Sequence, residues 1–165
     1  MKRGQLLGMP LVLLFALIVA ALLLAWGFMA VNDLVSQADY VDLLDRVDDL
    51  DNNVDSFMNY GKGTAKDYDL DFPGPVEYVC FYNPGSKGDC VLDGASCPQE
   101  LQDDLSLAVS SSYNLYVLPL NSFERTRFLI NDFYPKNGNP ECVSNGNTLL
   151  IAKDDGFVSV SYYDE

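Results

Sequence analysis

The stretch MPLVLLFALIVAALLLAWGFMAV, residues 9–31, decides the fold of this chain. It contains no ionisable side chain, and a helix of this length measures roughly 35 Å, enough to cross a hydrocarbon core of about 30 Å. A secretory signal peptide has an apolar core of only about 7–15 residues, followed by a small-residue cleavage site. Here Trp26, Gly27 and Phe28 follow instead. The stretch therefore predicts a membrane-spanning helix that stays in the protein.

The charges on either side of this helix are distributed unequally. Lys2 and Arg3 precede the apolar run, whereas all 24 acidic residues follow Asn32. Basic flanks stay on the cytoplasmic side of a membrane. We therefore expect a single-pass protein of the cell membrane, with its N-terminus in the cytoplasm and its C-terminal domain outside, in contact with membrane lipid.

The formal net charge of −14 excludes nucleic acid as a partner, because phosphate backbones would be repelled. A solvated acidic surface accounts for this excess. Specific calcium binding is the alternative, since Asp67, Asp69 and Asp71 imitate the opening of a calcium loop. However, Phe72 and Tyr78 stand where an EF-hand has glycine and glutamate. We predict no metal and no cofactor.

Small residues recur at a spacing of four within and just before the apolar helix. Gly4 is followed by Gly8, Ala16 by Ala20, and Ala21 by Ala25. Such spacing lets helix backbones approach closely in lipid. These positions are candidates for self-association into a homo-oligomer.

Beyond the membrane, apolar residues continue at steps of three and four, which is the period of an amphipathic helix. No proline interrupts the chain between Leu11 and Phe72, so we predict one helix over residues 7–60. Its outer half should pack on the domain that follows. The alternative is that the apolar stripe pairs with the same stripe of a second copy as a short coiled coil. The apolar stripe consists of Leu34, Val35, Ala38, Val41, Leu44, Val47, Leu50, Val54 and Phe57.

The rest of the chain alternates turn residues with short β-rich runs. We predict an α+β fold in which the long N-terminal helix packs on a small antiparallel sheet of four or five strands. A hairpin turns at Asp154, Asp155 and Gly156. The predicted strands are 76–82, 114–120, 127–134, 148–153 and 157–163, with a short helix over 98–111. The predicted regions are a cytoplasmic flank or leader (1–8), the transmembrane helix (9–31), the amphipathic helix (32–60) and an extracytoplasmic β-rich domain (61–165).

Four cysteines in a domain placed outside the cell favour disulfides over free thiols. Of the three pairings, we prefer Cys90–Cys97 as a local loop and Cys80–Cys142 as a long-range link. A zinc site built from all four thiolates is the alternative, but the pairs lack the CxxC spacing of zinc knuckles.

No catalytic constellation is visible in the sequence. Histidine is missing, which removes the usual general base. Arg125 and Arg127 are the only close arginine pair, and we expect them to pair with acidic residues. We therefore predict that the protein is not an enzyme.

Several segments resemble a group of uncharacterised archaeal membrane-anchored proteins. The likeness lies in the start, MKRGQLLGMPLVLLFALIVAALLLAWG, and extends to VEYVCFYNP (residues 76–84) and to the segment around Pro140, Glu141 and Cys142. This resemblance implies a single-span membrane topology and no particular activity.

The N-terminus is also similar to that of type IV pilins with a class III leader. Lys2, Arg3 and Gly4 form the short basic leader, and cleavage after Gly4 would leave Gln5 as the first residue. Many pilins have glutamate at the fifth mature position, which here is Met9. The resemblance implies a pilin-like fold, in which the outer half of the long helix packs on the sheet, and a subunit that assembles into a filament through its apolar helix.

The sequence thus leaves two functions open. One is an anchored protein that displays an acidic structural or binding domain to an unknown protein partner. The other is a pilin-like subunit, cleaved after Gly4 and assembled into a filament or pseudopilus.

Overall fold

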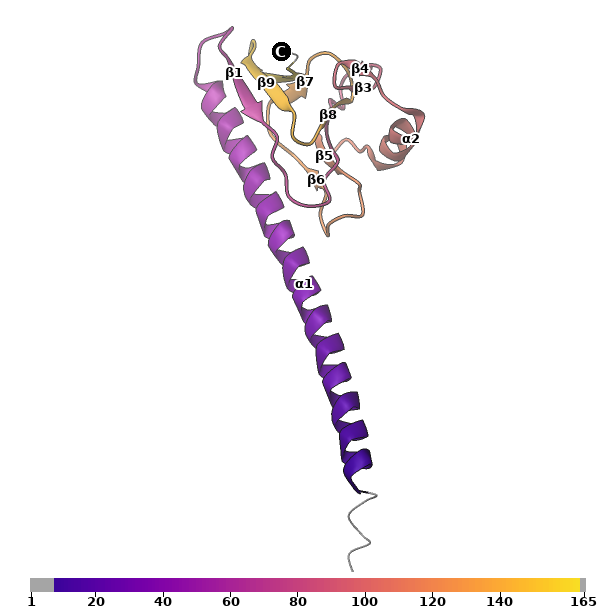
Figure 1. The fold of residues 1–165 in the computed structure, drawn as a ribbon. Coiled ribbons are helices and arrows are strands. Elements are labelled where there is room, and N and C mark those ends of the chain that lie inside the picture. Colours follow the sequence, from indigo (N-terminus) through magenta and orange to yellow (C-terminus); the bar gives the residue numbers. More distant parts are fainter. Residues whose placement is uncertain (1–7, 164–165) are drawn as a thin grey trace, which may run out of the picture. The chain divides into compact units, whose positions relative to one another are not determined.

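The computed structural model describes the backbone of residues 8–163 and the side chains of residues 12–163 (Figure 1). The chain divides into two compact units, Met1–Asp39 and Tyr40–Glu165, and helix α1 contributes to both. This helix spans Gly8–Met58, as the uninterrupted pattern predicts. It ends where Asn59 and Tyr60 donate to carbonyls three residues earlier. Two glycines, Gly61 and Gly63, then turn the chain, and Gly63 has the positive φ of 85° that glycine adopts most readily.

Ten strands and a second helix follow α1 in the unit Tyr40–Glu165 (Figure 1). The second helix, α2, carries Leu101, Leu105 and Ala108 on its buried side, at the spacing of an amphipathic helix. In chain order the elements are β1 (Ala65–Asp69), β2 (Tyr78–Phe81), β3 (Val91–Leu92), β4 (Ala95–Ser96), α2 (Gln99–Ala108), β5 (Leu115–Leu118), β6 (Arg127–Phe128), β7 (Phe133–Pro135), β8 (Glu141–Ser144), β9 (Thr148–Lys153) and β10 (Val158–Tyr162).

The strands form two sheets. One has four strands in the order β1-β9-β10-β7, and the other has six in the order β4-β3-β8-β2-β5-β6. Most neighbouring strands are antiparallel, but β7 runs parallel to β10 and β3 runs parallel to β8. The predicted α+β fold, a long N-terminal helix packed on antiparallel β-structure, is confirmed, and it is consistent with a pilin-like fold. The single sheet of four or five strands was wrong, because the chain builds two.

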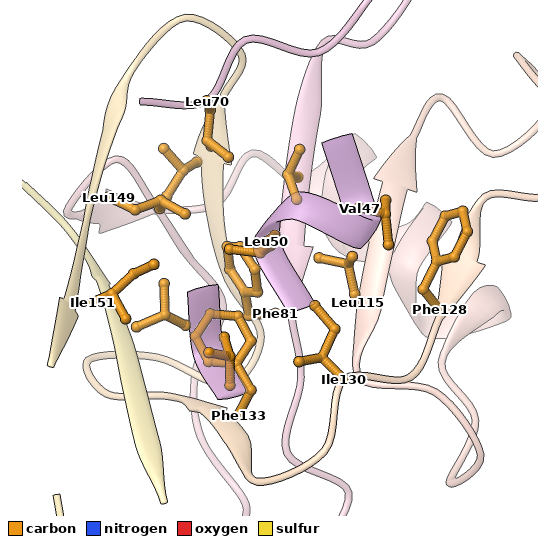
Figure 2. Close-up of a cluster of buried hydrophobic side chains, with 14 of the residues drawn as sticks. Val47, Leu50, Leu70, Phe81, Leu115, Phe128, Ile130, Phe133, Leu149 and Ile151 are labelled. Carbon is orange, nitrogen blue, oxygen red and sulfur yellow. The ribbon is translucent and has the colours of Figure 1, made fainter. Parts of the chain in front are cut away.

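The main hydrophobic core lies between the C-terminal part of α1 and both sheets. In Figure 2, Val47 and Leu50 extend from the helix among side chains of the two sheets and their loops. From the six-stranded sheet come Phe81 and Leu115, and from the four-stranded sheet come residues such as Ile151. The helix residues buried in this core are Leu43, Val47, Leu50, Val54 and Phe57.

The packed stripe of α1 differs in part from the predicted one. Leu43, which the prediction omitted, is fully buried, whereas Val41 is 57% exposed and Leu44 is only partly buried. Steps of three and four fit more than one helix face, so the partner sheets decide which face is covered. Leu34, Val35 and Ala38 belong to the other unit, Met1–Asp39.

A second, smaller core lies on the opposite face of the six-stranded sheet, beneath α2. Successive strand residues alternate between the two cores, as the strand period of two requires. Val79 and Phe81 contact the main core, whereas Cys80 points to the smaller one, where it meets Leu101 and Leu105 of α2. This alternation places the cysteines of the central strands under α2.

The strand predicted at residues 127–134 is interrupted. Asn114 explains the interruption, because its buried side-chain amide donates to the carbonyls of Ile130 (2.6 Å) and Phe133 (2.9 Å) and accepts from the amide of Ile130 (2.8 Å). Asp132 has a positive φ of 52° in the resulting turn. The segment therefore supplies β6 to one sheet and β7 to the other.

Candidate functional site: the apolar helix segment and the paired disulfides

Helix α1 is long and apolar enough to cross a membrane, judged by its length and composition. Its large apolar side chains from Val12 to Val35 are exposed, and Leu24 and Trp26 reach 76% and 72%. Exposed contiguous apolar surface of this extent marks a membrane or protein contact. An apolar helix near the N-terminus is thus the candidate membrane span, in agreement with the segment predicted at residues 9–31.

The residues suggested for self-association are partly within the described structure. Ala16 and Ala20 lie one turn apart on α1 and are exposed. Gly8 is the first residue of the helix. Gly4 and Gln5, the predicted leader junction, lie outside the described residues.

The structure contains two disulfides, Cys80–Cys142 and Cys90–Cys97, which are the pairs expected from the sequence. Cys80 and Cys142 lie directly opposite each other on the antiparallel neighbours β2 and β8, and both are fully buried. This disulfide therefore joins the two central strands of the six-stranded sheet, on the face that carries the smaller core.

The second disulfide closes a tight loop at the edge of the same sheet. Cys90 and Cys97 flank the paired strands β3 and β4, and the amide of Cys97 donates to the carbonyl of Cys90 (3.1 Å). The turn between these strands places Asp93 and Gly94 at positive φ values of 47° and 78°. Asp93 also accepts a hydrogen bond from the amide of Ser144 (3.0 Å) and so fixes the loop to β8.

The two disulfides lie next to each other. The sulfur atoms of Cys90, Cys97 and Cys142 are all within 4.8 Å of one another. Because each of these sulfurs is bonded to another sulfur, none offers a thiolate to a metal in this state. No local sequence pattern predicts this proximity, since it depends on the parallel pairing of β3 with β8.

The acidic triplet suggested as a calcium loop is dispersed in the structure. Asp69 accepts a hydrogen bond from the hydroxyl of Thr148 (2.8 Å), and Asp71 pairs with Arg46 (3.2 Å). Asp67 lies on strand β1. Asp69 is the last residue of this strand, Asp71 lies beyond it, and the latter two carboxylates have different partners.

Two cavities of about 370 Å³ lie on either side of the segment Gly88–Cys90. The first lies against α2 and is lined by Tyr82, Gln102 and Ser106, whereas the second lies against the loop after β7. Among the described residues, the titratable side chains that line these cavities are Asp89 in both, Tyr82 in the first, and Lys87 and Lys136 in the second.

Arg125 and Arg127 line a third cavity of about 340 Å³ together with Glu124. The guanidinium of Arg125 lies over the ring of Phe128, 4.8 Å from its centroid, and its Nε donates to the carbonyl of Arg127 (3.2 Å). Within residues 12–163, ion pairs form at Arg46 and Lys62 and at neither of these arginines. The expected pairing with acidic residues was wrong, because the aromatic face and a backbone carbonyl hold Arg125.

Two tyrosines and one aspartate have perturbed acidity. Burial raises the pKa of the Tyr68 hydroxyl, which also donates to Asp49 (3.0 Å). Burial likewise raises the pKa of Tyr116. Burial raises the pKa of Asp51 on α1, and the carboxylates of Asp55 and Asp48 raise it further. Tyr68 lies on strand β1, Tyr116 on strand β5 and Asp51 on helix α1.

Comparison with known proteins adds no further constraint: no protein-family model, curated protein or solved structure matches the chain.

Proposed function

We propose that this chain is a non-enzymatic, single-span membrane protein that displays an acidic, disulfide-stapled domain on the outer side of the cell membrane. Helix α1 carries this proposal. Its exposed apolar segment suits lipid, and its C-terminal residues, such as Leu50 and Val54, are fully buried in the core of the domain. The anchor and the domain therefore share one element of secondary structure.

The disulfides support an extracytoplasmic location, because such bonds persist in oxidising compartments. The basic residues Lys2 and Arg3 support a cytoplasmic N-terminus. The domain would act through its surface as a structural or binding module, and its acidic excess would keep that surface hydrated.

Cysteine labelling in intact cells tests this orientation. All four native cysteines are in disulfides, so a single introduced thiol can report its own location. In an Asp104→Cys variant, the exposed thiol on α2 should react with a membrane-impermeant maleimide without permeabilisation. A matched Gln5→Cys variant should react only after permeabilisation. The reverse pattern would show that the domain faces the cytoplasm.

A second candidate function is a pilin-like subunit that is cleaved after Gly4 and assembles into a filament or pseudopilus through its apolar helix. It is favoured by one observation: α1 is a single helix whose first part exposes apolar side chains and whose last part is packed in an α+β domain. Small residues such as Ala16 and Ala20 would let neighbouring helices approach closely.

The intact mass of the chain extracted from native membranes separates the two candidates. Loss of residues 1–4 would indicate leader cleavage, and a Gly4→Val variant should then keep its full mass and fail to enter sheared filament fractions. A full-length mass in the parent chain, with no filament fraction, would support the permanently anchored display protein.

A further inference from the structure

The two disulfides meet under the same helix. The bonded pairs are Cys80–Cys142 and Cys90–Cys97, yet the sulfurs of Cys90, Cys97 and Cys142 all lie within 4.8 Å of one another. Cys142 is therefore close to both sulfurs of the other disulfide. Its own partner, Cys80, is not part of this group of three.

Strand pairing produces this arrangement. Cys142 lies opposite Cys80 across β2 and β8, and it also lies opposite Leu92 in the parallel pair of β8 with β3. The loop that Cys90 and Cys97 close is thus held beside β8. Cys80, Cys97 and Cys142 belong to the same small core, and Cys90 packs against it.

The four sulfurs differ in their access to solvent. Cys80 and Cys142 are fully buried and Cys97 is 6% exposed, whereas Cys90 is only partly buried. Cys90 also lines both cavities beside the segment Gly88–Cys90. A small molecule that enters either cavity would reach Cys90 before any other sulfur.

We propose that these two disulfides form one thiol–disulfide exchange site whose substrate is a small-molecule thiol that attacks at Cys90. The incoming thiolate bonds to the sulfur of Cys90 and breaks the Cys90–Cys97 bond, which releases the Cys97 thiolate. That thiolate attacks the sulfur of Cys142, forms a Cys97–Cys142 bond and expels Cys80 as a thiolate. The incoming thiol loses one proton to solvent and Cys80 gains one, so two sulfur–sulfur bonds exist before and after.

This exchange lets a thiol open the buried Cys80–Cys142 bond while the domain stays folded. Direct attack on that bond is blocked, because both of its sulfurs have no exposed surface. The inference concerns the chemistry of the folded domain, and it does not depend on which proposed function is correct.

Tryptic digestion can follow each sulfur separately. Lysine and arginine positions place Cys80 in peptide 67–87, Cys90 and Cys97 in peptide 88–125, and Cys142 in peptide 137–153. In the starting state, peptide 67–87 is linked to peptide 137–153. After exchange, peptide 88–125 is linked to peptide 137–153 and Cys80 is free for alkylation.

The experiment treats the full-length, detergent-solubilised chain with 2-mercaptoethanol under native conditions, followed by acid quench, alkylation and mass spectrometry. We expect the exchanged link and alkylated Cys80 to appear together. In a Cys90→Ala/Cys97→Ala variant, alkylation of Cys80 should slow by about tenfold or more, because the attacking thiolate is missing. Equal rates in the parent and the variant would overturn the proposal, and so would a parent chain in which Cys97 is alkylated and Cys80 never is.

A second variant provides a test that needs no added thiol. Cys90→Ser leaves Cys97 as a free thiol beside Cys142, and the exchanged link between peptides 88–125 and 137–153 should form within a single molecule at a rate independent of protein concentration. As a matched control, Ser96→Cys in a Cys90→Ser/Cys97→Ser background places a thiol one residue away on the exposed strand β4. A folded Cys90→Ser variant that keeps only the Cys80–Cys142 link, or a control that exchanges equally fast, would overturn the proposal.

Discussion

The side chain of Glu141 accepts a hydrogen bond from the backbone amide of Tyr162, with 2.9 Å between Oε1 and the nitrogen. Glu141 begins β8 of the six-stranded sheet and Tyr162 ends β10 of the four-stranded sheet, so this bond joins the two sheets. The other oxygen, Oε2, accepts from the amides of Lys136 (3.1 Å) and Asn137 (2.9 Å). The carboxylate is fully buried, and backbone donors compensate the loss of water.

Glu141→Gln should destabilise the domain. The new amide group would place hydrogen-bond donors against backbone N–H groups, and each buried donor left without an acceptor costs about 1–3 kcal/mol. Denaturant unfolding of the full-length chain in detergent measures the effect. Glu77→Gln, the same change at an exposed position, is the control and should have little effect. Equal unfolding free energies of the two variants would show that the hydrogen bonds of the buried carboxylate do not stabilise the domain.

The two disulfides should contribute unequally to stability. In the loop-entropy model, a link across 62 residues contributes about 4 kcal/mol and a link across 7 residues about 2 kcal/mol. Cys80→Ala/Cys142→Ala should therefore lower the unfolding free energy more than Cys90→Ala/Cys97→Ala. Chemical denaturation under oxidising conditions compares them. An unchanged melting transition after loss of Cys80–Cys142 would contradict the assigned pairing.

Leu50→Ala tests the packing of α1 against the sheets. Leu50 has no exposed surface, and truncating a buried leucine costs about 2–5 kcal/mol. Val41→Ala, on the same helix but 57% exposed, should change stability by less than about 0.5 kcal/mol. Limited proteolysis should show faster cleavage of the Leu50 variant only. Similar protease resistance in both would mean that the helix does not depend on this core.

Asp51→Asn should stabilise the domain at neutral pH. The folded-state pKa of Asp51 is raised above its usual 3.8 by burial and by the nearby carboxylates of Asp55 and Asp48. A raised pKa favours the protonated folded state, so ionisation disfavours folding as the pH rises through that value. The variant should therefore melt at a higher temperature than the parent at pH 7 and show no gain below about pH 3. Asp104→Asn, an exposed position on α2, has the same change in charge, and an equal gain there would point to net charge alone.

Ala16→Leu/Ala20→Leu should weaken any self-association of the apolar helix. Leucines at these positions would hold neighbouring helix backbones apart. Chemical cross-linking in native membranes should show severalfold less dimer than the parent. Ala21→Leu/Ala25→Leu changes the other alanine pair, which lies on another helix face because successive residues are rotated by about 100°, so a loss in only one variant identifies the face that makes the contact. If both variants cross-link as the parent does, the small residues do not mediate contact.

Much of the architecture could be read from the sequence, because it depends on local composition. The candidate membrane-spanning stretch has a length and an absence of charge that few other structures share. Helix α1 follows from an uninterrupted pattern that ends near Gly61. The hairpin of β9 and β10 follows from two alternating runs around Gly156. The even number and the spacing of the cysteines favoured the observed pairing among three possible ones.

Other features depended on residues far apart in the chain. The parallel pairs β3–β8 and β7–β10 bring together segments that no local pattern relates. Strand β8 was missed because its four residues, Glu141–Ser144, include a buried glutamate that reads as a surface residue. Its burial is stable only because backbone amides from β10 and from the loop after β7 converge on it.

The sequence by itself determined an apolar helix able to span a membrane, its amphipathic continuation and a cysteine-stapled α+β domain. These features follow from hydrophobicity and periodicity, which each segment carries alone. Only the tertiary structure decided which face of α1 is buried, how the strands divide into two sheets and that both disulfides meet beside Cys142. Those outcomes depend on strand register and on buried hydrogen bonds between distant segments, and neither is encoded in a local pattern.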